Sequence, residues 1–140
     1  MSITFKDNSA NIAKLIEEAV DRALERIGLE AEGNAVDKIT DNGSVDTGNL
    51  RNSITHKVDA AEDKVYVGTD VEYAPYVELG TGIYAEGGGG RPTPWVYQDS
   101  KGNWHHTRGQ EPKPFLRPAA KDHKQDYANI LEDELQQVLK

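Results

Sequence analysis

The sequence contains no cysteine, which excludes a disulfide framework and any metal site built from thiolates. It also contains no apolar run close to the ~20 residues that a membrane-spanning helix requires. The first residues lack the apolar stretch of a secretory signal peptide. We therefore expect a protein that folds in the cytosol.

Apolar residues and positive charge are also scarce. The hydrophobic fraction is 36%, and 24 acidic residues stand against 16 basic ones, giving a formal net charge of −8. Most affinity of nucleic-acid binders comes from neutralising phosphates, so the lack of a basic run argues against sequence-specific DNA binding. An acidic surface would still allow DNA to slide past without sticking.

Two segments have the apolar periodicity of amphipathic helices. The first is expected to extend from about residue 10 to Ile39, with Asn8 or Ser9 as its side-chain cap. The second is expected to begin at Pro118. The first stripe comprises Ile12, Leu15, Ile16, Ala19, Val20, Ala23, Leu24, Ile27, Ala31, Ala35 and Ile39, and the second Ala120, His123, Tyr127, Ile130, Leu131, Leu135 and Val138.

The segments between these helices have strand and turn patterns. Residues 50–60 alternate between apolar and polar side chains, which predicts a half-buried strand, and residues 64–69 are expected to return antiparallel to it. Pro75 favours the start of a short helix that ends at Gly80-Thr81-Gly82.

Residues 82–110 form an expected insert that contains a four-glycine run, Gly87 to Gly90, and a hairpin. The hairpin pairs residues 95–98 with residues 103–106, and Gly102 supplies the positive φ of its turn. Trp95, Tyr97, Trp104 and His106 are expected on one face of it.

The predicted fold class is therefore α+β, with an N-terminal and a C-terminal amphipathic helix packed on an antiparallel sheet and an inserted β-hairpin. We expect one domain over residues 1–140, from which residues 82–110 project as a glycine-rich loop and hairpin.

Glu78 is the one carboxylate that the pattern singles out for chemistry. It stands beside Tyr76 and just before a glycine-flanked turn, so it is a candidate general base, and with His105 or His106 it would suit a small hydrolase or nuclease. The alternative is an ion pair with Arg51 or Arg117. Neighbouring residues on a strand face opposite ways, so the two adjacent histidines cannot both bind one metal ion.

The aromatic residues of the hairpin allow two further interpretations. Trp95, Tyr97 and Trp104 could stack nucleic-acid bases, which would make the insert a nucleic-acid-binding module. With Arg91 they could instead form a protein interface, because Trp, Tyr and Arg dominate the residues that anchor such interfaces. The local balance of charge favours the protein interface.

Three short clusters occur in a defined order along the chain. Residues 45–54 read VDTGNLRNSI, residues 71–82 read VEYAPYVELGTG, and residues 114–119 read PFLRPA. In this order they resemble the tail-component family of siphovirus-type bacteriophages and prophages. The motif positions are Asp46, Thr47, Gly48, Leu50 and Arg51, then Tyr73, Glu78, Gly80 and Thr81, then Phe115, Leu116, Arg117 and Pro118.

These motif residues also have a physical interpretation. The Asp46-Thr47-Gly48 segment is expected to form a turn that aims the following strand. Phe115 and Leu116 are expected to fill the gap between the last helix and the sheet. Arg117 is expected to bind the Glu78 carboxylate through two of its guanidinium nitrogens.

The resemblance implies a structural protein of the virion tail or neck, not an enzyme, with no cofactor or metal. It implies tail completion, head–tail joining or a minor tail role, in an oligomeric ring that contacts other connector or tail proteins and through which DNA passes. Assembly would take place in the bacterial host cytoplasm. The 82–110 insert departs from the shortest family members and would dock either on a neighbouring ring or on its own subunit.

Overall fold

The computed structural model describes residues 7–43, 47–99 and 101–139. Five α-helices and two antiparallel two-stranded ribbons within these residues confirm the α+β class. The elements are α1 (Ser9–Asn42), α2 (Thr47–Ser53), β1 (Thr55–Asp59), η1 (Ala60–Glu62), β2 (Lys64–Gly68), α3 (Ala74–Leu79), η2 (Gly82–Tyr84), η3 (Glu86–Gly88), β3 (Trp95–Gln98), β4 (Trp104–Thr107), α4 (Leu116–Lys121) and α5 (Lys124–Leu139).

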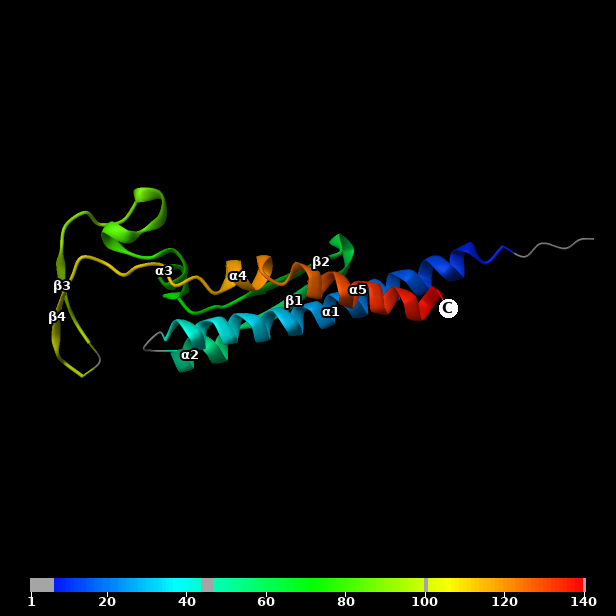
Figure 1. Ribbon diagram of the computed structural model, residues 1–140, viewed down its shortest axis with the longest axis horizontal. Coiled ribbons are helices and arrows are strands. Elements are labelled where there is room, and N and C mark those ends of the chain that lie inside the picture. Colours follow the sequence, from blue (N-terminus) through cyan, green and yellow to red (C-terminus); the bar gives the residue numbers. More distant parts are fainter. Residues whose placement is uncertain (1–6, 44–46, 100, 140) are drawn as a thin grey trace, which may run out of the picture.

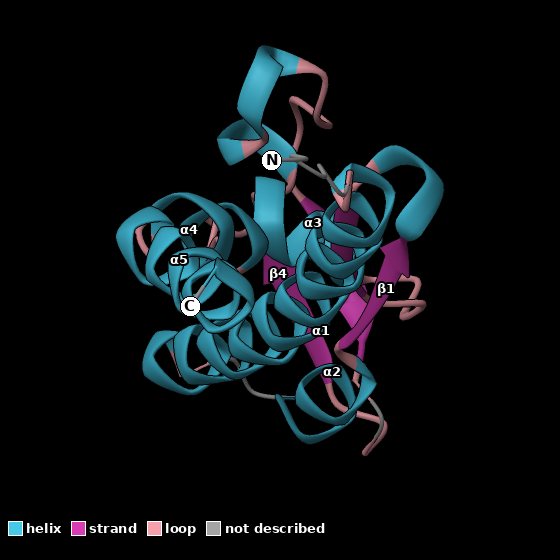
Figure 2. Ribbon diagram, turned by 90° about the vertical axis from the view of Figure 1, so that its right-hand side faces the viewer, coloured by secondary structure: helices cyan, strands magenta, loops and turns pink. Residues whose placement is uncertain are grey.

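Helix α1 is the axis of the molecule. It runs along most of an elongated shape, and the insert that carries β3 and β4 lies at one end (Figure 1). The β1–β2 ribbon packs against α1, and α4 and α5 pack along α1 on another side (Figure 2). Of the two long helices, α1 therefore makes the main contact with the ribbon. Helix α5 packs on α1 on a different side from the ribbon.

The ends of α1 differ from the expectation. Neither Asn8 nor Ser9 caps the helix through its side chain; instead the Asp7 carboxylate accepts the Ser9 amide at 2.8 Å. The helix continues past Ile39 to Asn42 and ends at Gly43, whose φ of 64° lets its amide bond the Thr40 carbonyl.

Residues 50–53 are helical, so the expected strand over residues 50–60 begins five residues late. Leu50 and Ile54 are buried in the same core cluster, which their spacing of four residues allows when Leu50 lies on the helix α2. Tertiary burial of these two side chains outweighs the local alternation. The expected turn is also wrong at Thr47 and Gly48, which belong to α2, and Asp46 lies outside the described residues.

The core lies where α1, α2, α3 and α4 meet. Its largest fully buried side chains are Phe115, Ile39 and Leu50. Leu116 is partly buried against it. Phe115 thus fills the gap beside the last helical segment, as the sequence predicts.

The C-terminal helix is broken rather than continuous from Pro118. Helix α4 ends at Lys121 and α5 begins at Lys124, and Ala120 is exposed instead of facing the core. The Tyr127 hydroxyl donates to the Ala119 carbonyl across the break and accepts the Asn34 amide of α1 at 3.0 Å.

His56 fastens the β1–β2 ribbon to α1. Its Nδ1 lies 2.6 Å from Glu32 Oε1 and its Nε2 lies 2.6 Å from Glu25 Oε1. Its ring crosses α1 at Gly28, where a Cβ would come within 2.3 Å of the imidazole. Hydrogen bonds that the His56 ring donates to Glu32 and Glu25 raise the pKa of His56 above its ordinary value of 6.5, against the opposing effect of burial.

The His56 contact makes stability depend on pH in a defined direction. Both ring nitrogens can donate only in the protonated form, so the contribution is full below pH 6.5 and is lost as pH rises through the raised pKa. We expect the melting temperature of the wild type to fall over that range more steeply than that of His56→Gln. Thermal melts of the two proteins from pH 6.5 upward test this, and parallel curves would contradict it.

Candidate functional site

The Glu78 carboxylate caps the start of α4 from a distant part of the chain. It is only 8% exposed. Its Oε2 accepts the amides of Phe115 at 2.7 Å and Leu116 at 3.0 Å, and its Oε1 accepts the Arg117 amide at 3.0 Å. The first amides of a helix have no partners within the helix, so an anion placed there is stabilised.

The predicted ion pair between Glu78 and Arg117 is present, at 3.1 Å between Oε1 and Nε. Arg51, the other candidate, instead lies 3.4 Å from the Thr40 hydroxyl. Burial acts to raise the pKa of Glu78, but the amides of residues 115, 117 and 116 and then the Arg117 side chain outweigh it, so the pKa falls below its ordinary value. The carboxylate is thereby held in its charged form.

Arg117 joins α4 to the insert as well as to α3. Its two terminal nitrogens bind the two carboxylate oxygens of Glu86, at 2.8 and 3.0 Å, and one of them also donates to the Glu78 carbonyl at 3.1 Å. The expected two-nitrogen contact with a carboxylate therefore forms with Glu86, and the Glu78 carboxylate accepts from the Arg117 side chain only through Nε. We call Glu78, Glu86 and Arg117 the clasp.

The insert leaves and re-enters the core through a narrow stem of two antiparallel segments. The Thr81 amide donates to the Gln110 carbonyl at 2.9 Å, and the Ile83 amide to the Arg108 carbonyl at 3.0 Å. Gly82 makes the approach possible, because with its φ of 62° a Cβ would lie 1.9 Å from the Arg108 carbonyl oxygen. The glycine-flanked turn of the second cluster thus holds the stem together.

The hairpin forms where expected, with Gly102 at φ 86° in its turn, but its faces differ from the prediction. Trp95 pairs with Thr107 and Tyr97 with His105, whereas Trp104 pairs with Gln98. Directly paired residues share a face, so Trp95 and Tyr97 face one way and Trp104 with His106 the other. One continuous aromatic face was therefore the wrong prediction.

Each aromatic residue of the hairpin has its own surroundings. The Tyr97 ring stacks on His105 with centroids 5.2 Å apart, and the Arg91 guanidinium lies 5.4 Å from the centre of the Trp95 ring. Trp104 is 69% exposed, more than any other large apolar side chain among the described residues. The hairpin therefore leaves large apolar side chains exposed.

An apolar groove of about 460 Å³ lies between α3 and the insert. Tyr76, Leu79 and Trp95 contribute large apolar side chains to it, and Arg91 and Glu86 line it as well. Because Glu86 binds Arg117, the clasp also sets one wall of this groove.

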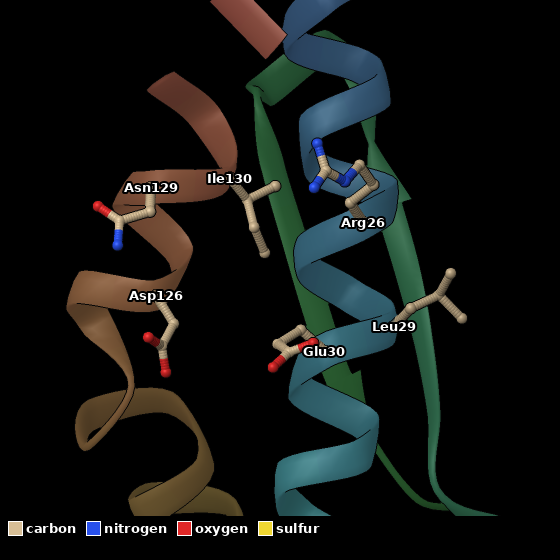
Figure 3. Close-up of a pocket in the computed structure, with 6 residues that line it drawn as sticks. All are labelled: Arg26, Leu29, Glu30, Asp126, Asn129 and Ile130. Atoms are coloured by element: carbon tan, nitrogen blue, oxygen red, sulfur yellow. The ribbon is translucent and has the colours of Figure 1, made fainter. Parts of the chain in front are cut away.

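A second, shallow groove of about 400 Å³ separates α1 from α5 (Figure 3). Glu30 and Asp126 extend toward it from the two facing helices, and Ile130 points toward α1 (Figure 3). Arg26 at its edge binds Asp133 at 2.8 Å and Glu134 at 3.0 Å. These ion pairs fasten the two helices together.

The geometry gives little support to the catalytic interpretation. Four donors already occupy both oxygens of Glu78, and its lowered pKa makes it a weak base. His105 is bound to Asp99 at 2.7 Å. In the part of the chain that the structure describes, no three histidine or carboxylate side chains gather to hold a metal ion.

The remaining motif residues lie in or beside the core. Leu50 is buried, Arg51 is exposed, and Tyr73 is partly buried just before α3. Gly80, with φ 80°, ends α3, and the Thr81 hydroxyl accepts the Gln110 amide at 2.9 Å. Pro118 lies within α4. The second and third clusters thus meet at the base of the insert, and Leu50 of the first cluster packs in the same core as Phe115.

Sequence reasoning missed two partners. Glu86 stands in a loop whose path no periodicity indicates, so its contact with Arg117 had no local signal. The His56 contact did leave a signal, because Glu25, Gly28 and Glu32 lie on one side of a predicted helix with a glycine between two carboxylates.

The buried Glu78 carboxylate bound to backbone amides, beside an insert with exposed aromatic residues, has a structural arrangement in which the carboxylate holds the chain together. A family model described as "Bacteriophage HK97-gp10, putative tail-component" matches residues 4–80, which is more than half of the chain, and the chain belongs to this family. It is thus a tail-associated structural protein of a phage or prophage.

The match includes the first sequence cluster and residues 71–80 of the second, so Thr81, the insert and the third cluster lie beyond it. Comparison with curated proteins and with solved structures finds no significant match. Among the described residues, no helix combines the length and apolar character needed to cross a bilayer.

Proposed function

We propose that this chain acts in virion assembly at the head–tail junction or the tail end, as a ring of identical subunits whose inserts contact neighbouring connector or tail proteins. One observation carries the proposal. The clasp and the stem hold an insert that exposes Trp104, Tyr97 and Val96 to 69%, 47% and 47%. A clasp built on the buried Glu78, beneath exposed apolar residues, suits a surface that a partner covers.

In this role the contribution of the protein is geometric. The core sets the position of the clasp, the clasp and stem set the direction of the hairpin, and the hairpin presents its two different faces to its surroundings. Trp104 and Tyr97, which lie on opposite faces, would allow the hairpin to insert between two neighbours. The chain needs no catalytic residue or cofactor for this function.

The functional test is to replace Trp104 by alanine in the phage or inducible prophage that encodes the chain. We expect a fall of at least tenfold in infectious particles, with unjoined heads and tails in electron micrographs, because loss of an anchoring Trp removes about 2 kcal/mol or more from an interface. Tyr66→Ala is the matched control, since Tyr66 is 55% exposed on the β1–β2 ribbon, away from the insert. A wild-type yield from the Trp104 variant would refute the proposed contact.

The acidic composition suits a ring through which DNA passes without binding. The net charge of −8 would repel phosphates from the lumen wall. We expect the purified protein to retain no duplex or single-stranded DNA in a filter or mobility-shift assay at low salt. Steeply salt-dependent retention would favour the nucleic-acid-binding interpretation instead.

A further inference from the structure

The first two turns of α1 expose an apolar stripe. Ile12 and Leu15 are each 47% exposed, although the same stripe is buried or partly buried from Ala19 onward. Helix α1 continues past the end of α5 here, so these turns project from the body of the molecule (Figure 1). Glu17 and Glu18 are exposed on the next turn. Asp7 is exposed as well, and the exposed Lys14 offsets only one of these three charges, so this end of the molecule is apolar with flanks that are acidic on balance.

The groove between α3 and the insert lies toward the opposite end of the molecule (Figure 1). Its walls expose apolar surface, with Tyr76 at 61% and Leu79 at 43%. The volume of about 460 Å³ is enough for two aliphatic side chains that enter together.

Charge at the groove is opposite to charge at the helix end. The insert carries three cations, Arg91, Lys101 and Arg108, against two carboxylates, Glu86 and Asp99, so its net charge is +1, and Glu86 is bound to Arg117. Arg91 lines the groove itself. The insert beside the groove therefore has a net positive charge, which is complementary to the acidic flanks at the start of α1.

We propose that the first two turns of α1 from one copy dock in the α3–insert groove of the next copy. The proposal deepens the ring function proposed above and rests on it. An amphipathic helix that places residues i and i+3 in an apolar groove is a recurrent recognition mode, and Ile12 and Leu15 have this spacing.

The occupant is a second copy because one chain carries both complementary surfaces at opposite ends. Two different patches make a head-to-tail contact, and repetition of a head-to-tail contact produces a closed ring or an open filament. A two-fold contact between identical patches would instead stop at a dimer. The arrangement therefore accounts for a ring without any second interface.

Two variants separate the two halves of this contact. The helix-end variant combines Ile12→Asp and Leu15→Asp, and the groove variant is Tyr76→Asp. We expect the wild type to be a multiple of 15.5 kDa by light scattering, and each variant to remain a monomer. Leu29→Asp is the matched control, because Leu29 is 57% exposed on α1 but belongs to neither patch, and it should retain the wild-type mass.

Mixing the two variants gives the sharpest result. Each retains one intact patch, so an equimolar mixture should form one contact per pair and stop at a dimer of twice the monomer mass. A mixture that stays monomeric, a variant that keeps the wild-type mass, or a wild type that is monomeric at every concentration would each overturn the head-to-tail contact. Circular dichroism of each variant confirms that the fold is retained.

The outcomes also distinguish this inference from the ring function. If the wild type forms a ring and both variants still form it, the interface lies elsewhere and the ring function stands. If the Trp104 variant assembles normal particles while the mixed variants form a dimer, the head-to-tail contact stands and the proposed role of the insert in virion assembly fails.

Discussion

Replacement of Glu78 by glutamine is expected to lower the melting temperature by roughly 10 °C. Glutamine has nearly the same shape, but its amide group presents two donors where the carboxylate presents only acceptors. At least one of the amides of Phe115, Leu116 and Arg117 then loses its partner and faces another donor inside the core. We expect a cost of about 3 kcal/mol, because a buried donor without a partner loses its full solvation.

Glu86→Gln is the matched control for Glu78→Gln. Both carboxylates bind Arg117, but the Glu86 side chain is 42% exposed, against 10% for that of Glu78. Exposed ion pairs contribute less than about 1 kcal/mol, so the control should melt within about 4 °C of the wild type. Equal effects of the two substitutions would show that the ion pair, and not the capping of α4, is the important interaction.

The effect of Glu78→Gln should also depend on pH in one direction. The pKa of Glu78 is lowered in the folded protein, so its contribution is present above the ordinary value of 4.5 and is lost as pH falls through the lowered pKa. The melting temperatures of wild type and variant should therefore converge in acid. A difference that stays constant into acid would exclude a charged carboxylate as the source of the stability.

The sequence predicted elements well where one period dominated. The α1 stripe, the second strand of the ribbon, the short helix after Tyr73 and the hairpin with Gly102 all have a single consistent pattern. The strand prediction for residues 50–54 failed because Leu50 and Ile54 fit both the period of two of a strand and the spacing of four of a helix. Only the burial of both side chains in one core, which is not a local property, decides between the two.

The candidate site was predictable only in part. Glu78 and Arg117 carry opposite charges in two rare motifs, so their pairing could be inferred without a structure. The amides that surround Glu78 could not, because they depend on where the chain returns after 36 residues of loop and hairpin. The same holds for Glu86 and for the stem, whose partners are set by how the insert folds back and not by spacing.

Replacement of Gly82 by alanine is expected to release the insert while leaving the core folded. The added Cβ would lie 1.9 Å from the Arg108 carbonyl oxygen and 2.7 Å from Gly109 Cα, and no flexible side chain can yield at either contact. The positive φ of 62° adds about 1 kcal/mol for a residue with a Cβ. The stem must therefore separate, which breaks its backbone hydrogen bonds, including that from the Ile83 amide.

Limited trypsin digestion measures this release. The insert carries two cleavage sites, Lys101 and Arg108, because Pro92 prevents cleavage after Arg91. A fall of 1.4 kcal/mol or more in the free energy of opening the stem would speed cleavage by about tenfold or more. Gly89→Ala is the matched control, because Gly89 lies in the same insert with open space around it and a φ of −87°.

Cleavage at equal rates in the Gly82 and Gly89 variants would mean that the stem does not hold the insert. If the Gly82 variant is cleaved faster, it should also assemble poorly, although every aromatic residue of the hairpin is intact. Loss of assembly without loss of any contact residue would show that the direction of the insert, and not only its composition, determines what it can bind.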